Sequence, residues 1–143
     1  MGSLYHADIL KWSEDQAGIL RQLAAGLRVN EAPDWANIIE EIESVGSSQL
    51  SAVRSNLVQA LLHDLKALAW PDAPYVPHWR AEGQVFRDNA AADFTPSMRQ
   101  RIDLAALYRR VLRGLPATID GQPPLPVPVE CPVTLDDLLR DHA

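Results

Sequence analysis

The sequence contains only one cysteine, Cys131, which excludes an intramolecular disulfide and any zinc site built from several cysteines. Cys131 lies between Glu130 and Pro132, with no basic neighbour to favour its thiolate, so it is a poor candidate for a catalytic nucleophile. Such sparing use of cysteine fits a reducing compartment, and we expect a cytoplasmic protein.

Long apolar runs are also missing. No stretch approaches the roughly 20 apolar residues that a membrane-spanning helix needs, and the first eight residues lack the basic and apolar regions of a secretory signal. We therefore expect no membrane association. Motifs such as the P-loop, G-x-G-x-x-G and G-x-S-x-G are absent as well, so the sequence indicates no cofactor and favours a protein that is not an enzyme.

Basic residues are in the minority, with 13 Lys and Arg against 19 Asp and Glu, for a net charge of −6. An acidic chain repels the phosphate backbone of a nucleic acid, which argues against nucleic-acid binding. Four arginines are nevertheless expected on the outer face of one helix, namely Arg99, Arg109, Arg110 and Arg113. We interpret them as a solvated face that is available to a partner, with nucleic-acid association as an alternative.

The eleven prolines divide the chain, because proline breaks a helix interior but is tolerated in the first turn. Apolar residues recur at steps of three and four in the proline-free runs. This spacing predicts helices over residues 7–27, from Pro33 to just before Pro71, over 78–92, and from Thr95 to Gly114. Residues 116–133 hold six prolines and predict an extended arm, and a capping-box pattern at Thr134 predicts a short helix over 134–141.

The predicted fold class is therefore all-α, an irregular four-helix bundle with one very long helix and a proline-rich C-terminal arm ending in a short fifth helix. We expect a single domain over residues 1–143, with the bundle formed by residues 1–115. One apolar stripe follows the long helix, through Trp35, Ile39, Ile42, Gly46, Leu50, Val53, Leu57, Leu61, Asp64 and Leu68. Any kink is expected at Gly46, because Gly46-Ser47-Ser48 is a weak helix former.

Several of these segments, in this order, resemble the domain-of-unknown-function family numbered twenty-nine, which is widespread in cyanobacteria and proteobacteria. The resembling pieces are Tyr5, Asp8 and Trp12, then Asp34-Trp35 and residues 40–46, Leu61-Leu62-His63 with Lys66, Trp79-Arg80, Pro96-Ser97, and residues 130–135. The resemblance implies a helical bundle and no particular activity. The chain departs from the family pattern at Asp64, where a leucine is usual, and over residues 83–87.

Three carboxylates lie within four positions of the run NIIEEIESVG. At about 100° per residue, Glu40 and Glu43 lie about 60° apart on the helix while Glu41 points elsewhere. No histidine follows a glutamate by three positions, so the Glu-x-x-His motif of di-iron bundles is absent. We interpret Glu40 and Glu43 as residues at the start of a helix that pair with an arginine on another helix or on a partner chain.

A second polar group surrounds His63. His78 and Glu82 are spaced by four on one helix, and an antiparallel turn near residue 73 would bring both to His63. A metal or catalytic cluster of these three residues, with Asp64 nearby, is one interpretation. The other is that His63 bonds to a neighbour within the bundle and that His78 lies on the surface.

Asp64 interrupts the apolar stripe, and a buried carboxylate needs a partner. We predict a pair with Arg101, with Arg80 as the alternative partner, unless the helix end frays and leaves Asp64 in solvent. For the protein as a whole, the sequence favours a non-catalytic helical protein–protein interaction module that binds a protein partner or itself. A metal binder or enzyme using His63, His78 and Glu82 is the first alternative, and a nucleic-acid-associated protein is the second.

Overall fold

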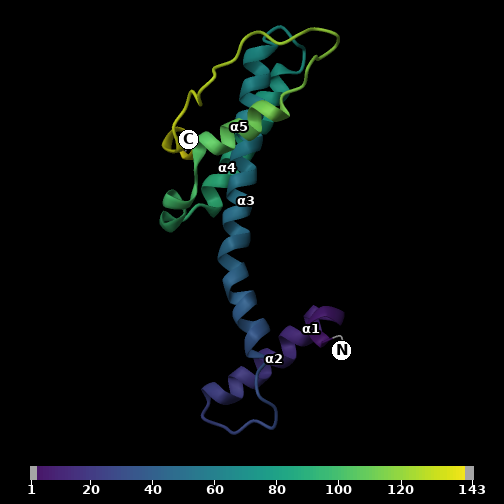
Figure 1. The fold of residues 1–143 in the computed structure, drawn as a ribbon, viewed down its shortest axis with the longest axis vertical. Helices are drawn as coiled ribbons and strands as arrows, with labels where there is room; N and C mark the ends of the chain where they lie inside the picture. The colour runs from purple at the N-terminus through teal and green to yellow at the C-terminus, as the bar shows by residue number, and fades with distance from the viewer. Residues whose placement is uncertain (1–2, 141–143) are drawn as a thin grey trace. The chain divides into compact units, whose positions relative to one another are not determined.

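A computed structural model describes residues 3–140, and Figure 1 shows their path. The helices are α1 (Leu4–Ala7), α2 (Ile9–Ala24), α3 (Trp35–Ala69), α4 (Val76–Asp93), the 3₁₀-helix η1 (Pro96–Arg101), α5 (Leu104–Gly114) and α6 (Leu135–Leu139). Over the described range the only β-type pairing is one isolated antiparallel bridge, between Ile119 and Gln122. The all-α class predicted from the sequence is confirmed.

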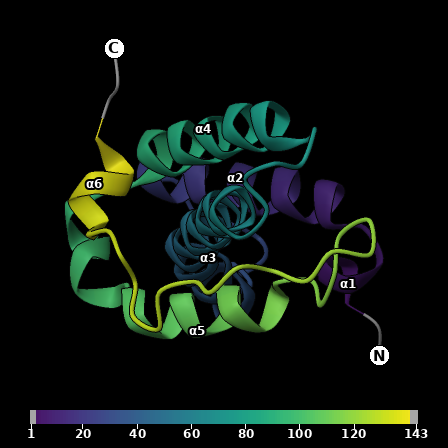
Figure 2. The same cartoon turned by 90° about the horizontal axis from the view of Figure 1, so that it is seen from above.

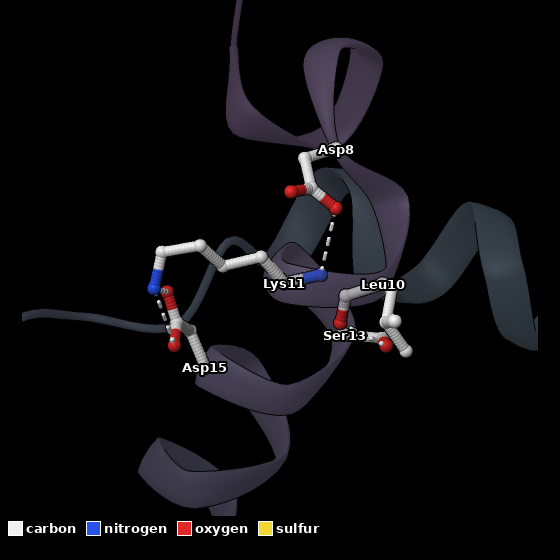
Figure 3. Close-up of polar contacts among 5 residues, drawn as sticks. All are labelled: Asp8, Leu10, Lys11, Ser13 and Asp15. Carbon is white, nitrogen blue, oxygen red and sulfur yellow. Dashed lines mark hydrogen bonds and ion pairs between the residues drawn. The ribbon is translucent and has the colours of Figure 1, made fainter.

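The helix predicted over residues 7–27 is shorter at both ends, since α2 spans Ile9–Ala24. Asp8 sets its beginning. Asp8 has a non-helical backbone, with φ −153° and ψ 87°, and its carboxylate accepts a hydrogen bond of 3.1 Å from the backbone nitrogen of Lys11. Figure 3 shows this cap together with the Lys11–Asp15 ion pair in the next turn. Asp8 thus ends α1 and begins α2. The helix ends before Gly26, which adopts φ 78°, a conformation that suits glycine.

Helix α3 is continuous through Gly46, so the kink allowed for at this position does not break the helix. At 1.5 Å per residue, its 35 residues span about 52 Å, more than one small core can cover. By its contacts the chain divides into two compact units, residues 1–47 and 48–143. The first part of α3 belongs to the N-terminal unit, and the rest belongs to the C-terminal unit.

The C-terminal unit is built around the second part of α3, with α4 and α5 on opposite sides of it (Figure 2). Its main core cluster holds the buried residues Leu50, Val53, Leu57, Val58, Leu61, Leu65, Ala90, Met98, Leu107, Tyr108, Val111 and Leu138. A second buried cluster consists of Ala67, Ala69, Trp70 and Trp79. Gly83 is buried where α4 packs against α3, and a Cβ at this position would make ordinary contacts of 3.4 Å with the Cβ of His63 and 3.8 Å with the carbonyl oxygen of Ala60.

The fourth predicted helix, from Thr95 to Gly114, is in fact two elements. η1 ends at Arg101, and Asp103 begins α5 by accepting a hydrogen bond of 3.2 Å from the backbone nitrogen of Ala106. Asp103 is an intrinsically good N-cap, so the chain restarts its helix there instead of continuing the first one.

The proline-rich arm is fastened to the C-terminal unit by backbone groups, as a chain that cannot form a helix must be. Leu125 donates its backbone N–H to the carbonyl of Ala69 at 2.9 Å. The hydroxyl of Tyr108 donates to the carbonyl of Pro128 at 2.6 Å. The capping box predicted at Thr134 is present and begins α6, whose last residue is Leu139. Residue 141, the predicted end of this helix, lies outside the described residues.

Candidate functional site

The N-terminal unit is held by a small polar network centred on Asp34. One oxygen of its carboxylate accepts hydrogen bonds from Nε1 of Trp12 at 3.0 Å and from Nδ2 of Asn37 at 2.8 Å. The backbone nitrogen of Asp34 donates to Oε1 of Gln16 at 2.7 Å. The hydrogen bond from Asn37, followed by that from Trp12, lowers the pKa of Asp34. This network ties α2 to the beginning of α3.

The second tie in this unit joins α1 to α3. The hydroxyl of Tyr5 donates a hydrogen bond of 2.5 Å to Oε1 of Glu41, and the ring of Tyr5 packs edge-on against Trp12 with centroids 4.8 Å apart. The hydrogen bond to Glu41, with smaller contributions from desolvation and nearby carboxylates, raises the pKa of Tyr5 to about 12. Sequence reasoning missed Glu41, although its offset from Glu40 and Glu43 was a signal that it faces a different neighbour.

Glu40 and Glu43 themselves are exposed on α3. Within residues 3–140, neither takes part in an ion pair, so the pairing with an arginine of the same chain that the sequence suggested is not seen there. Pairing with an arginine of a partner chain stays a prediction.

The N-terminal unit buries few apolar side chains and leaves many of them exposed. Its buried apolar residues are Trp12, Pro33 and Ile38. Nine large apolar side chains are exposed, namely Leu4, Ile9, Leu10, Leu23, Leu27, Trp35, Ile39, Ile42 and Val45. Only five such residues are exposed among the 93 described residues of the C-terminal unit. Exposed apolar side chains are therefore concentrated in the N-terminal unit.

The apolar stripe of α3 shows the same contrast along a single helix. In its middle the stripe is covered, with Val53 and Leu57 fully buried, whereas Leu68 at its C-terminal end is again 51% exposed. Toward its N-terminal end it is bare, since Trp35 is 52%, Ile39 52% and Ile42 68% exposed. We call these three residues the α3 strip. They lie within about 60° of one another around the helix, because they are spaced by four and three.

His63, His78 and Glu82 do come together, as the antiparallel turn predicted. Nε2 of the buried His63 lies 3.2 Å from one oxygen of Glu82, and Nε2 of His78 lies 3.4 Å from the other. Nδ1 of His63 lies 2.7 Å from the carbonyl oxygen of Gln59. Both ring nitrogens of His63 therefore lie within hydrogen-bonding distance of an oxygen atom.

The three side chains are linked through the carboxylate of Glu82, each of whose oxygens lies near one histidine nitrogen. No group of three or more His, Cys, Asp or Glu side chains in the described part of the chain is arranged to hold a metal ion. What the cluster does is join α3 to α4.

Asp64 is half-buried and pairs with Arg87 of α4, not with Arg101 or Arg80. The prediction of Arg101 is wrong because η1 and α5 are separate elements, so the helical register that placed Arg101 near Tyr108 does not hold. Arg101 instead offers its carbonyl to Arg54, and Arg80 is exposed. The two places where the chain departs from the pattern of the resembling family, Asp64 and residues 83–87, thus meet in one ion pair.

The remaining candidate residues are spread over the surface of the C-terminal unit. Lys66 lies over the ring of Trp79, with its Nζ 6.0 Å from the centroid. Arg99 belongs to η1, where it pairs with Asp136 at 2.8 Å and lies over the ring of Phe94. The other arginines of the expected basic face, Arg109, Arg110 and Arg113, are exposed on α5. The four arginines therefore do not form one continuous helical face.

A cavity of about 370 Å³ lies apart from both polar clusters, between the turn that follows α3 and the arm. Trp70, Asp72 and Asp120 are among its lining residues. The hydroxyl of Tyr75 donates to Asp120 at 2.8 Å, so part of the polar lining is already satisfied.

No helix in the described part of the chain is long and apolar enough to cross a membrane.

Comparison with known proteins adds a family and a fold. A family model described as "Domain of unknown function DUF29" matches residues 4–142. The crystal structure of an alpha-helical protein of unknown function from Rhodospirillum rubrum is similar, with a TM-score of 0.70 and 28% sequence identity, over 99% of this chain and 92% of that chain. A search of curated proteins finds no match.

Proposed function

Since the chain belongs to the DUF29 family, whose description assigns no activity, we propose from its geometry that it is a non-catalytic helical protein–protein interaction module. In this proposal the C-terminal unit, in which α4 and α5 pack against α3, serves as a stable base. The N-terminal unit binds the partner, in the cytoplasm. The observation that carries the proposal is the bare α3 strip, which continues a stripe that is buried elsewhere on the same helix.

The strip is costly to leave in water. Burial of a side chain such as isoleucine contributes about 1.5–3 kcal/mol, and the strip holds two isoleucines and a tryptophan that are each more than half exposed. Single exposed apolar residues are ordinary on protein surfaces, but a contiguous apolar surface marks an interaction site. A partner helix laid along the strip would use the spacing of four and three that helix-in-groove recognition uses.

The same part of α3 is also weak as a helix on its own. Residues 45–48 are all exposed, and they include Gly46, beside which a Cβ would meet nothing within 4 Å. Glycine and serine are poorer helix formers than alanine, and an isolated helix of this length is marginal in water. Packing against a partner would add to the few tertiary contacts that Tyr5 and Trp12 give this part of the chain.

Photo-cross-linking tests this proposal. A photoreactive amino acid replaces Ile42 in the full chain, which is expressed in its native host and irradiated. The matched control carries the same group at Val85, which is 56% exposed on α4 in the C-terminal unit. The proposal predicts a discrete covalent adduct from position 42 and none from position 85. The absence of an adduct at position 42, or equal adducts at both positions, would contradict it.

A further inference from the structure

The negative charge of the protein is concentrated in the N-terminal unit. Residues 1–47 carry eight acidic residues, Asp8, Glu14, Asp15, Glu31, Asp34, Glu40, Glu41 and Glu43, and three basic ones, Lys11, Arg21 and Arg28. This unit therefore holds a formal charge of −5 out of the −6 of the whole chain, and the larger C-terminal unit is nearly neutral.

Along α3 itself, the charged residues beside the strip are all acidic. The sequence has no Lys or Arg between Arg28 and Arg54. At about 100° per residue, Glu43 borders the strip on one side with Glu40 behind it, and Glu41 lies on the opposite side. Glu41 is engaged by Tyr5, whereas Glu40 and Glu43 have no ion-pair partner among residues 3–140. An apolar centre with an acidic border is complementary to an apolar helix face with a basic border.

This charge disfavours a second copy of the same unit as the occupant. Two N-terminal units packed strip to strip would bring two units of charge −5 together, and like charges at an interface oppose association. The proposed function leaves open whether the partner is the chain itself or another protein, and the charge decides between them.

Resting on that proposed function, we infer that the α3 strip binds an amphipathic helix of another protein, whose apolar residues follow helical spacing and whose flanking residues are Lys or Arg. The apolar residues of this helix cover Trp35, Ile39 and Ile42. Its basic residues lie against Glu40 and Glu43, where they form the arginine or lysine pairs that the chain does not supply within its described residues. The basic border speeds association and selects the partner, and the apolar strip provides most of the affinity.

Trp35 is a built-in reporter of this binding. It is 52% exposed, whereas Trp12, Trp70 and Trp79 are 6%, 5% and 7% exposed. A helix that covers the strip will therefore shift the emission of Trp35 to shorter wavelength, with little change from the other three indoles. A Trp35→Phe variant confirms the origin of the signal.

The experiment titrates the full chain with three synthetic helical peptides of 18 residues. The first carries leucines on one face and lysines beside them, the second has glutamates in place of the lysines, and the third is a scrambled form of the first whose leucines share no face. We expect the dissociation constant of the lysine peptide to be at least tenfold lower than those of the other two. The advantage over the glutamate peptide should shrink as salt is raised from about 0.05 to 0.5 M, because salt screens exposed charges.

Variants distinguish binding of the lysine peptide at the α3 strip from nonspecific attraction of a basic peptide to an acidic protein. Ile42→Ser should weaken the lysine peptide at least tenfold, and the double variant Glu40→Gln/Glu43→Gln should weaken it several-fold at low salt. Val85→Ser is the control for the loss of an equally exposed apolar side chain and should change nothing. Equal binding of the scrambled peptide, or binding that survives Ile42→Ser, would overturn the inference.

Two further results would overturn the inference while leaving the proposed function intact. The first is equal or tighter binding of the glutamate peptide. The second is a doubled light-scattering mass of the chain that Ile42→Ser halves, which would make a second copy the occupant. If instead position 42 gives no photo-adduct in the native host, the proposed function itself fails, whatever the peptides do.

Discussion

The carboxylate of Asp64 on α3 is paired with the guanidinium of Arg87 on α4, beside Gly83, where the two helices pack together. The side chain of Arg87 is only 19% exposed and that of Asp64 is 34% exposed. A partly buried charge that loses its partner is left without compensation, whereas the loss of both charges is far cheaper.

Removal of one partner of this pair should therefore cost more than removal of both. We expect Asp64→Leu to lower the free energy of unfolding by about 1–2 kcal/mol, since it removes the ion-pair partner of Arg87 and leaves it only the electrostatic attraction of Asp137. The double variant Asp64→Leu/Arg87→Leu should recover most of that loss. Urea denaturation of the two single variants and the double variant measures the coupling, and strictly additive effects would show that the pair contributes nothing.

Two positions on α3 should respond differently to the same kind of truncation. Leu57 is fully buried, so Leu57→Ala should cost about 2–5 kcal/mol of unfolding free energy. Ile42 is 68% exposed, so Ile42→Ala should change the unfolding free energy of the isolated chain by less than about 0.5 kcal/mol. Chemical denaturation followed by circular dichroism compares them. A cost at Ile42 similar to that at Leu57 would mean that the chain covers its own strip.

Alkaline pH should loosen the N-terminal unit through Tyr5. The hydrogen bond to Glu41 raises the pKa of Tyr5 from 10.0 to about 12, so the folded chain holds this proton more tightly than the unfolded chain does. The resulting stabilisation is complete below pH 10 and is lost as the pH rises toward 12. Absorbance at 295 nm follows the titration, and Tyr5→Phe should remove a phenol whose pKa is about 12. Loss of a phenol that ionises near pH 10 would contradict the assignment.

Much of the fold was predictable because proline and cap residues act locally. Pro33 and Pro71 bracket α3, and the antiparallel turn after it was enough to predict that Glu82 meets His63. How these side chains interact was not predictable, because the sequence does not give their geometry. Only the structure shows that each oxygen of Glu82 lies near a histidine nitrogen. The partner of Asp64 was missed for a similar reason, because Asp103 restarts the helix and changes the register of every residue before it.

The division into two units was not visible in the sequence. The apolar stripe of α3 keeps its spacing of three and four from Trp35 to Leu68, so periodicity alone predicts one continuous core. Which part of a stripe is covered depends on how far the other helices reach, and that is a property of the tertiary structure. The concentration of acidic residues before Arg54, by contrast, is visible in the sequence. It becomes evidence for a basic partner only because the structure shows that the α3 strip beside it is exposed.

The central claim is that the first part of α3 is packed only when a partner binds. Amide hydrogen exchange along α3 in the purified, isolated chain tests it. We predict that amides of residues 39–47 exchange at least a hundredfold faster than those of residues 53–65, because only the latter lie under a buried core. Saturating lysine peptide should slow the first group and leave the second unchanged. Uniformly strong protection from residue 39 to residue 65 in the isolated monomer would contradict the account.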